Sequence, residues 1–279
     1  MDDETLKRAV TENVRQALAE DVGTGDISAE LIDADANASA RVITRSSGIF
    51  CGKLWVQETI KQVDAGVVLD WHVADGDKIS QDTPLFDLTG KARSLLTAER
   101  TMLNFVQLLS GTATRTAEYV ALIKNTQASL LDTRKTLPGL RVAQKYAVHC
   151  GGGQNHRIGL FDAFLLKENH IAAAGSISRA IERARNLHPN KPVEVEVESI
   201  GELEEAIEAG ADIAMLDNFT TEDTARAVSL TNGALKLEAS GGIDATSITE
   251  IATTGVDYIS IGDLTKTVTP LDLSMRFKD

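Results

Sequence analysis

A run of 29 residues, TRKTLPGLRVAQKYAVHCGGGQNHRIGLF at 133–161, concentrates side chains suited to binding an anion. It contains no Asp or Glu, and its basic members are Arg134, Lys135, Arg141, Lys145, His149, His156 and Arg157. The chain of 279 residues, in contrast, has 41 acidic and 28 basic residues and a formal net charge of −13. Arginine suits carboxylates because its planar guanidinium can bond both oxygens at once. The run predicts a site for a small anion, with solvated helix surface as the alternative.

A second group of chemically active residues is acidic. The strand-like segment VEVEVES at 193–199 places three glutamates on one face, because side chains alternate along a strand: Glu194, Glu196 and Glu198. Like charges on one face need cations, either Lys135 and Lys167 or a metal ion. For Glu194 we favour a structural salt bridge. For Glu196 and Asp217 we favour a hard divalent ion, Mg²⁺ or Mn²⁺, since carboxylates without Cys and with little His suit it better than zinc.

A third feature is a glycine pair in LEASGGIDATSITEI at 237–251, which reads as strand, two glycines and then helix. Free backbone N–H groups and a helix N-terminus at such a turn can bind an anion. The similar segment DYISIGDLT follows at 257–265. In parallel barrels phosphate often binds at the final strand–helix loops, so this part predicts a phosphate site.

These residues follow apolar runs that alternate with helical stretches from residue 129 on. The six runs are SLLDT (129–133), AFLLK (163–167), VEVEV (193–197), IAMLD (213–217), LKLEAS (235–240) and DYISIG (257–262). Such alternation indicates a parallel sheet, and a parallel barrel builds its site at the carboxyl ends of its strands. Because six strands are visible where eight are standard, we expect an incomplete barrel.

The first part of the chain follows a different pattern. A helix is expected at 4–20, short strands at 39–45, 67–73 and 84–90, and a long helix at 92–111. The apolar residues Leu103, Val106 and Leu109 of the long helix require a partner surface, which a second subunit could supply.

Composition excludes several functional classes. A pI near 4.9 argues against nucleic acid as a partner. The N-terminus MDDETLKRAV has no apolar signal-peptide core, and no apolar run is long enough to span a bilayer. Two cysteines, Cys51 and Cys150, lack metal-ligand spacing and suit a reducing compartment, so we expect a cytoplasmic protein.

The motifs in their order resemble one family. The segments LLDTRKTLPGLR, KYAVHCGGGQNHRIGLFDAFLLKENHI, VEVEVES, MLDN, EASGGI and ISIGDLTK are similar to those of quinolinate phosphoribosyltransferases (decarboxylating). The resemblance extends over essentially the whole chain, from EDVGTGDIS through LTAERTMLNFVQLLSG to LDLSMRF. The pair DTRKTxPGLR and GGGxNHR is highly specific.

The resemblance implies an α/β fold with two domains and a homodimer. An N-terminal α/β sandwich of hammerhead type would comprise residues 1–110 and the tail 268–279, and an incomplete, about six-stranded parallel α/β barrel would comprise 111–267. It also implies a reaction with Mg²⁺, in which quinolinate and phosphoribosyl pyrophosphate give nicotinate mononucleotide, pyrophosphate and CO₂ for NAD biosynthesis. No nucleic acid or membrane takes part.

The resemblance also assigns residues to roles. The quinolinate pocket would consist of Arg134, Lys135, His156, Arg157 and Lys167, with Arg100 from the partner subunit. Glu196 and Asp217 would serve Mg²⁺ and the ribose, and together with Lys135 and Lys167 they are the expected catalytic residues. Phosphate would be held by Ser240, Gly241, Gly242 and Gly262. A carboxylate among the basic residues would repel the dianionic quinolinate by about 4 kcal/mol per close pair at an intermediate dielectric, which explains the acid-free run.

Two other functions stay open at this point. One is a related transferase that acts on another base, such as nicotinate. The other is a non-catalytic anion-binding or carrier protein built on the hammerhead domain. Glu196 and Asp217 argue against the second, because a pure binder has no use for a pair of metal ligands.

Overall fold

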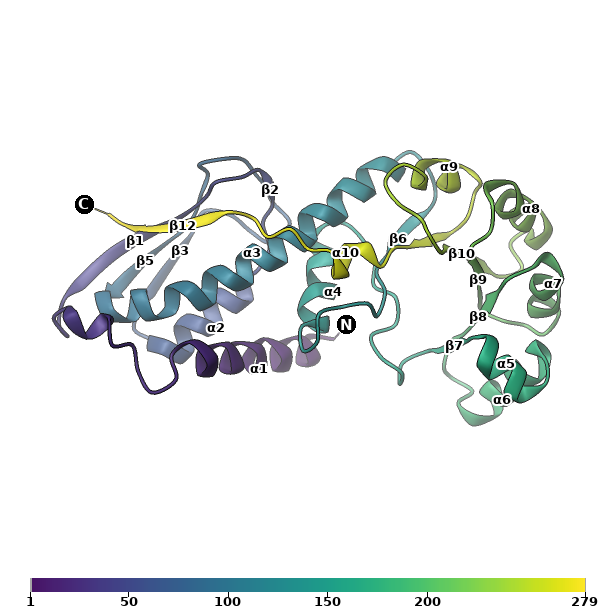
Figure 1. Ribbon diagram of the computed structural model, residues 1–279, viewed down its shortest axis with the longest axis horizontal. Helices are drawn as coiled ribbons and strands as arrows, with labels where there is room; N and C mark the ends of the chain where they lie inside the picture. The colour runs from purple at the N-terminus through teal and green to yellow at the C-terminus, as the bar shows by residue number, and fades with distance from the viewer. Residues whose placement is uncertain (1, 279) are drawn as a thin grey trace. The chain divides into compact units, whose positions relative to one another are not determined.

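The computed structural model describes residues 2–278, which form two compact units (Figure 1). The first unit comprises the chain up to Ala117, the segment Thr136–Gly152 and the chain from Leu264 on. The second comprises Glu118–Lys135 and Gly153–Asp263. These units divide the chain differently from the expected domains, which were 1–110 with 268–279 and 111–267. The domain limits stay a prediction.

The first unit is built on an antiparallel sheet of order β12-β1-β5-β3. Its elements are α1 (Asp3–Asp21), a 3₁₀ turn (Ala29–Leu31), β1 (Asn37–Thr44), β2 (Gly48–Ile49), α2 (Lys53–Asp64), β3 (Val68–Trp71), β4 (Lys78–Ile79), β5 (Pro84–Lys91), most of α3 (Ala92–Ile123), α4 (Arg141–Cys150), α10 (Asp263–Lys266) and β12 (Leu273–Phe277). The predicted helix and the three predicted strands are confirmed. The last strand pairs with β1, with Leu273 opposite Thr44 and Phe277 opposite Ala40.

The apolar face of α3 is buried inside this unit. Leu103, Val106 and Leu109 are 1%, 0% and 0% exposed, and they pack with residues of the sheet and of α1 and α2. The expectation that this face needs a second subunit was therefore wrong. The sheet supplies the apolar partner, because alternate residues of β1 and β5 such as Val42 and Leu88 point toward it.

Helix α3 also continues past Gly111, where the sequence predicted its end. A Cβ atom at Gly111 would lie 2.3 Å from the carbonyl oxygen of Thr269. The glycine thus permits the segment before β12 to approach the helix closely and does not terminate it. Neither this helix nor any other among residues 2–278 is long and apolar enough to cross a membrane.

The second unit is an open sheet of six parallel strands in the order β6-β11-β10-β9-β8-β7. These are β6 (Ser129–Leu131), β7 (Phe164–Leu166), β8 (Val193–Val197), β9 (Ile213–Asp217), β10 (Lys236–Ser240) and β11 (Tyr258–Ser260), and all six were predicted. The intervening helices are α5 (Glu168–Ala174), α6 (Ile177–Leu187), α7 (Ile200–Glu208), α8 (Thr221–Thr231) and α9 (Ile248–Thr253). They lie outside the curved sheet (Figure 1). Because β6 and β7 are the two ends of the order, the barrel is incomplete, as expected.

Candidate active site

The carboxyl ends of the six parallel strands meet at one edge of the second unit's sheet, here called the rim. Eight of the predicted site residues lie on or just after these strand ends: Arg134, Lys135, Lys167, Glu196, Asp217, Ser240, Gly241 and Gly262. Gly242 follows directly. The topology therefore gathers at one edge residues that are up to 128 positions apart in the sequence.

Two neighbouring strands contribute an ion pair at the rim. Leu166 at the end of β7 is in register with Val195 of β8, so the next residues, Lys167 and Glu196, come side by side. The ammonium group of Lys167 contacts Oε2 of Glu196. The side chain of Lys167 is 46% exposed and that of Glu196 is 13% exposed. Lysine is thus one of the cations that the glutamate face needed, and it stands where an anionic ligand could reach it.

The glycine pair after β10 adopts left-handed backbone conformations. Gly241 has φ +94° and Gly242 has φ +63°, values that residues with a Cβ atom adopt at a cost. A Cβ atom at Gly241 would lie 2.2 Å from Oδ1 of Asn218. The backbone N–H of Asn218 donates to the carbonyl oxygen of Ser240 (2.9 Å), and its side-chain amide donates to Oδ2 of Asp217 (2.8 Å). One asparagine therefore joins the predicted metal carboxylate to the predicted phosphate loop.

The helix after this loop is short and begins beyond it. Helix α9 begins at Ile248, six residues beyond Gly242, and is only six residues long. The side chain of Asp244 accepts hydrogen bonds from the backbone N–H groups of Thr246 (2.8 Å) and Ser247 (3.2 Å). An acidic side chain already occupies the turn before this helix, which makes its N-terminus less suited to an anion; the phosphate site stays a prediction. Any phosphate site here depends on the glycine loop itself.

The ends of β6 and β11 are also close. A Cβ atom at Gly262 would lie 2.9 Å from Cδ of Lys135. The aliphatic part of Lys135 therefore lies over Gly262, and the absence of a side chain there leaves room for it. This contact places one of the predicted catalytic lysines beside the last predicted phosphate residue.

The basic run at 133–161 is divided between the two units. Arg141, Lys145 and His149 lie on α4 in the first unit, and Lys145 is completely buried there. Arg134, Lys135, His156 and Arg157 belong to the second unit. Of the basic residues in the run, only these four belong to the same unit as the strand ends of the rim.

Two acidic residues that flank the basic run hold its second part in place. Asp132 is completely buried and accepts hydrogen bonds from the side chain of Asn155 (2.7 Å) and the backbone N–H of His156 (2.9 Å). Asp162 accepts from the backbone N–H groups of Ile158 (2.6 Å) and Gly159 (3.0 Å). The acids at either end of the run thus fix the backbone on both sides of Arg157.

The side chain of His156 points into the sheet and not into solvent. Its Nε2 lies 2.8 Å from Oε2 of Glu194 and 3.4 Å from Oε2 of Glu238. The three side chains are 10%, 4% and 0% exposed. The preference for a structural role of Glu194 agrees with this geometry, although its partner is a histidine and not a lysine.

Burial and charge set the protonation of this cluster. Burial lowers the pKa of His156, but hydrogen bonds and charges from Glu194 and Glu238 outweigh it and raise the pKa to about 10. Burial raises the pKa of Glu194 to about 7, against the opposing effect of His156. Both shifts favour a proton held between the ring of His156 and the carboxylate of Glu194.

The guanidinium of Arg157 lies near charges of both signs. Burial lowers its pKa, and the positive charge of Arg134 lowers it further, whereas Glu194 and Asp162 raise it. One of its N–H groups donates to the carbonyl oxygen of Ala163 (3.2 Å). An anion bound between two arginines that repel each other would stabilise both charges, so this arrangement favours anion binding.

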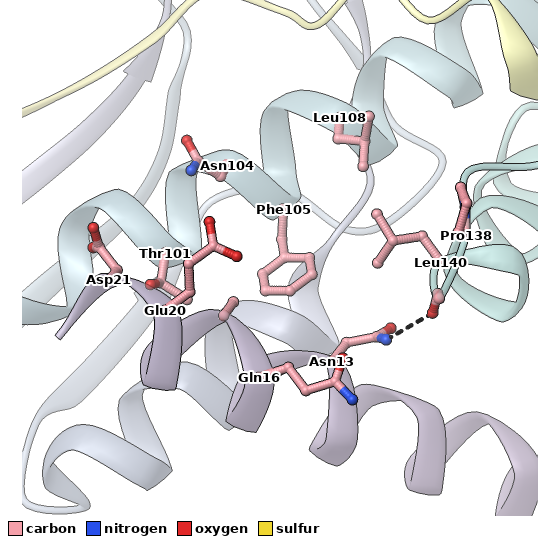
Figure 2. Close-up of a pocket in the computed structure, with 12 residues that line it drawn as sticks. Asn13, Gln16, Glu20, Asp21, Thr101, Asn104, Phe105, Leu108, Pro138 and Leu140 are labelled. Carbon is pink, nitrogen blue, oxygen red and sulfur yellow. Dashed lines mark hydrogen bonds between the residues drawn. The ribbon is translucent and has the colours of Figure 1, made fainter. Parts of the chain in front are cut away.

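Arg100 lies on the part of α3 that belongs to the first unit, and its side chain is exposed. Nearby in that unit is a pocket of about 310 Å³ between α1, α3 and the turn at Pro138–Leu140 (Figure 2). The side-chain amide of Asn13 donates to the carbonyl oxygen of Gly139 across it (3.0 Å). The pocket contains Glu20 and Asp21 but none of the predicted site residues, and its acids make it unsuited to an anion.

The sequence analysis missed four polar residues that organise the rim: Asp132, Asn155, Asn218 and Glu238. Glu238 carried a usable signal, because it alternates with Ser240 along β10 and must face the same side. Asn218 had none, since its role depends on a backbone of φ +56° that only the structure shows.

Comparisons with known proteins agree along the whole chain. Residues 26–110 match the family described as quinolinate phosphoribosyl transferase, N-terminal domain, and residues 112–276 match its C-terminal domain. A probable nicotinate-nucleotide pyrophosphorylase [carboxylating] of Bacillus subtilis is 44% identical, over 92% of this chain and 89% of that protein. The nicotinate-nucleotide pyrophosphorylase [carboxylating] of Mycobacterium leprae is 40% identical, over 96% of both chains. The solved nicotinate-nucleotide pyrophosphorylase of Francisella tularensis is 52% identical with a TM-score of 0.93, over 98% of this chain and 97% of that one.

Proposed function

Since the chain belongs to the quinolinate phosphoribosyltransferase family, we propose that the rim is the place where it carries out that family's reaction. The chain is a pentosyltransferase of de novo NAD biosynthesis. It transfers the phosphoribosyl group of phosphoribosyl pyrophosphate to quinolinate, and the products are nicotinate mononucleotide, pyrophosphate and CO₂.

The observation that carries this assignment to the rim is the Lys167–Glu196 ion pair, which shares one edge of the sheet with the glycine loop after β10 and with Arg134 and Lys135 after β6. In our proposal Arg134, Lys135, Arg157 and Lys167 surround the two carboxylates of quinolinate. His156, whose ring nitrogens already face Glu194 and the backbone N–H of Arg157, supports Arg157 in this pocket. Ser240, Gly241, Gly242 and Gly262 hold phosphate. Glu196 and Asp217 face the ribose, where carboxylates stabilise the positive charge that develops at the anomeric carbon.

The chemistry then needs no nucleophile from the protein. The ring nitrogen of quinolinate forms a bond to the anomeric carbon as the bond to pyrophosphate breaks. The pyridinium ring accepts the electron pair released when the 2-carboxylate leaves as CO₂, and the ring carbon takes up a proton. The side chains at the rim bind, orient and exclude water, so positioning accounts for most of the rate.

The proposed metal ion is Mg²⁺, held by Glu196 and Asp217. These two residues end neighbouring strands, β8 and β9, and offer only carboxylate oxygens, the donor type that Mg²⁺ prefers. When bound, the ion would neutralise charge on the departing pyrophosphate. We also propose a cytoplasmic location, on the ground that Cys51 and Cys150 are both free thiols.

A base-choice assay tests the function. Purified protein is incubated with phosphoribosyl pyrophosphate, Mg²⁺ and either quinolinate or nicotinate, and mononucleotide is measured by chromatography. We expect nucleotide from quinolinate only. Nucleotide from nicotinate alone would identify a transferase for another base, and no turnover with either would favour an anion-binding protein.

We further propose a homodimer in which Arg100 of the partner subunit completes each quinolinate pocket. The support is the resemblance at LTAERTMLN together with the exposure of Arg100. The test mixes Arg100→Ala and Arg157→Ala, each nearly inactive alone, under conditions that allow subunits to exchange. Half the dimers would be mixed with one intact site of two, so about a quarter of wild-type activity should return. No recovery despite demonstrated exchange would place Arg100 in its own subunit's site or in none.

A further inference from the structure

The cluster of His156, Glu194 and Glu238 has more hydrogen-bond acceptors than donors. Oε1 of Glu194 and both carboxylate oxygens of Glu238 are buried without a hydrogen bond among the residues that the structure describes. Within this cluster Nε2 of His156 approaches Oε2 of Glu238 to 3.4 Å. A buried carboxylate without hydrogen bonds opposes folding. Glu238 therefore costs the folded state stability, and its place in the cluster needs another explanation.

The imidazole ring of His156 is fixed at both nitrogens. The backbone N–H of Arg157 donates to Nδ1 (2.8 Å), and Nε2 faces Oε2 of Glu194 (2.8 Å). A nitrogen that accepts a hydrogen bond carries no proton, so in this arrangement Nε2 carries it and donates it to the carboxylate. The ring thus links strands β8 and β10 to the backbone of Arg157.

This link reaches the residues proposed to bind quinolinate. The backbone of His156 is held by Asp132 at the end of β6, and Arg157 follows directly. Glu194 attracts the guanidinium of Arg157, whereas Arg134 repels it. Glu194 and Asp162 are the carboxylates that offset the repulsion between the two arginines before the substrate arrives.

We propose that Glu238, together with Glu194, is a positioning residue that orients His156 and, through its ring, holds Arg157 ready for the carboxylates of the substrate. The proposal rests on the proposed function for the identity of that substrate. The geometry of the proposal is independent of the proposed function. The contacts from Glu238 through His156 to the backbone of Arg157 all lie within the second unit.

A metal ion is the other candidate occupant of this cluster. One histidine and two carboxylates offer ligand atoms that all lie within 4.8 Å of one another. Metal binding, however, would use the lone pair of Nε2 while the N–H of Arg157 uses that of Nδ1. The ring would then be an imidazolate and add a third negative charge to a buried site. A proton between Nε2 and Glu194 requires no such charge.

Glu238→Gln tests the proposal, because it keeps the size of the side chain and removes its charge. We expect the KM for quinolinate to rise about tenfold, with the KM for phosphoribosyl pyrophosphate within twofold of wild type. The unfolding midpoint in urea should stay the same or rise, since a buried charge without hydrogen bonds is lost. Hydrogen exchange at the backbone N–H of Arg157 should be faster by about tenfold. Glu194→Gln should change the KM for quinolinate and the exchange at Arg157 in the same direction.

The control is Asp87→Asn on β5 of the first unit, where Oδ2 of Asp87 lies 3.2 Å from Nε2 of His72. It should leave both KM values and the exchange at Arg157 unchanged. Unaltered kinetics and exchange in Glu238→Gln would overturn the proposal. A lower unfolding midpoint with both KM values changed in parallel would also overturn it, by showing a purely structural role. One metal ion per chain that is lost in Glu238→Gln would replace the proposal by a metal site. If the wild type does not use quinolinate, the proposed function fails, whereas exchange at Arg157 still decides the role of Glu238.

Discussion

Each unit of the molecule contains a histidine that faces carboxylates, but the two clusters have opposite balances of charge. On the antiparallel sheet the buried carboxylate of Asp87 accepts from Arg41 (2.8 and 2.9 Å) and Lys278 (2.5 Å), with Nε2 of His72 at 3.2 Å and the exposed Asp70 nearby. On the parallel sheet two carboxylates converge on one ring, that of His156. The first cluster has donors in excess, and the second has acceptors in excess.

The difference shows which cluster serves the fold. The hydrogen bond from Arg41 lowers the pKa of Asp87, burial opposes it, and Lys278 and His72 lower it further, so that the pKa lies far below its usual range. Such a carboxylate stabilises the folded state at neutral pH. Around His156 burial raises the pKa of Glu194, and Glu238 is buried without a hydrogen bond among the described residues; both cost stability. Buried carboxylates that lower the stability of the sheet carrying the rim are typical of a functional site.

The largest expected effect comes from the rim itself. Glu196→Gln should lower kcat about 100- to 1000-fold, as expected when one charge that stabilises a transition state is removed. Quinolinate affinity, measured by calorimetry, should stay within about twofold, because Lys167 keeps its charge. Glu198→Gln, at an exposed residue just after the end of β8, is the matched control and should behave as wild type. An equal loss of quinolinate binding in Glu196→Gln would argue against a role at the ribose.

The smallest expected effect comes from the Asp87 cluster and concerns stability alone. The pKa of Asp87 is lower in the folded than in the unfolded chain, so its contribution is present above about pH 4 and is lost as the pH falls through the folded pKa. Asp87→Asn should lower the free energy of unfolding by about 1–3 kcal/mol at pH 7. Urea unfolding between pH 5 and about pH 2 should show a shallower pH dependence for the variant. Equal slopes for the two proteins would mean that Asp87 has an ordinary pKa.

Sequence patterns predicted the strands of both sheets better than the contacts between them. The six parallel strands are short apolar runs with polar ends. Each strand can therefore be recognised from its own residues alone. The predicted end of α3 was wrong because a glycine such as Gly111 can mark either a helix end or a close contact between segments. Only the position of Thr269 against Gly111 in the structure shows that it is a close contact. The burial of Leu103, Val106 and Leu109 within their own unit likewise depends on strands far away in the sequence.

The same limit applies to the rim. Arg134, Lys167, Glu196 and Asp217 could be placed there because each ends a predicted strand. Glu238 was missed although it alternates with Ser240, because its importance lies in a contact with a residue 82 positions earlier. Residue type and spacing identify which groups can bind substrate, whereas the groups that orient them become visible only in three dimensions.

The most direct test of the central claim is the stoichiometry of the reaction on quinolinate labelled with ¹⁴C in its 2-carboxylate. The protein is supplied with phosphoribosyl pyrophosphate and Mg²⁺, and released CO₂, mononucleotide and pyrophosphate are counted over the same interval. The account predicts equal amounts of all three products, and no labelled CO₂ when phosphoribosyl pyrophosphate is omitted, because only the ribosylated pyridinium can accept the electron pair. Nucleotide that retains the label, or CO₂ released without phosphoribosyl pyrophosphate, would contradict it.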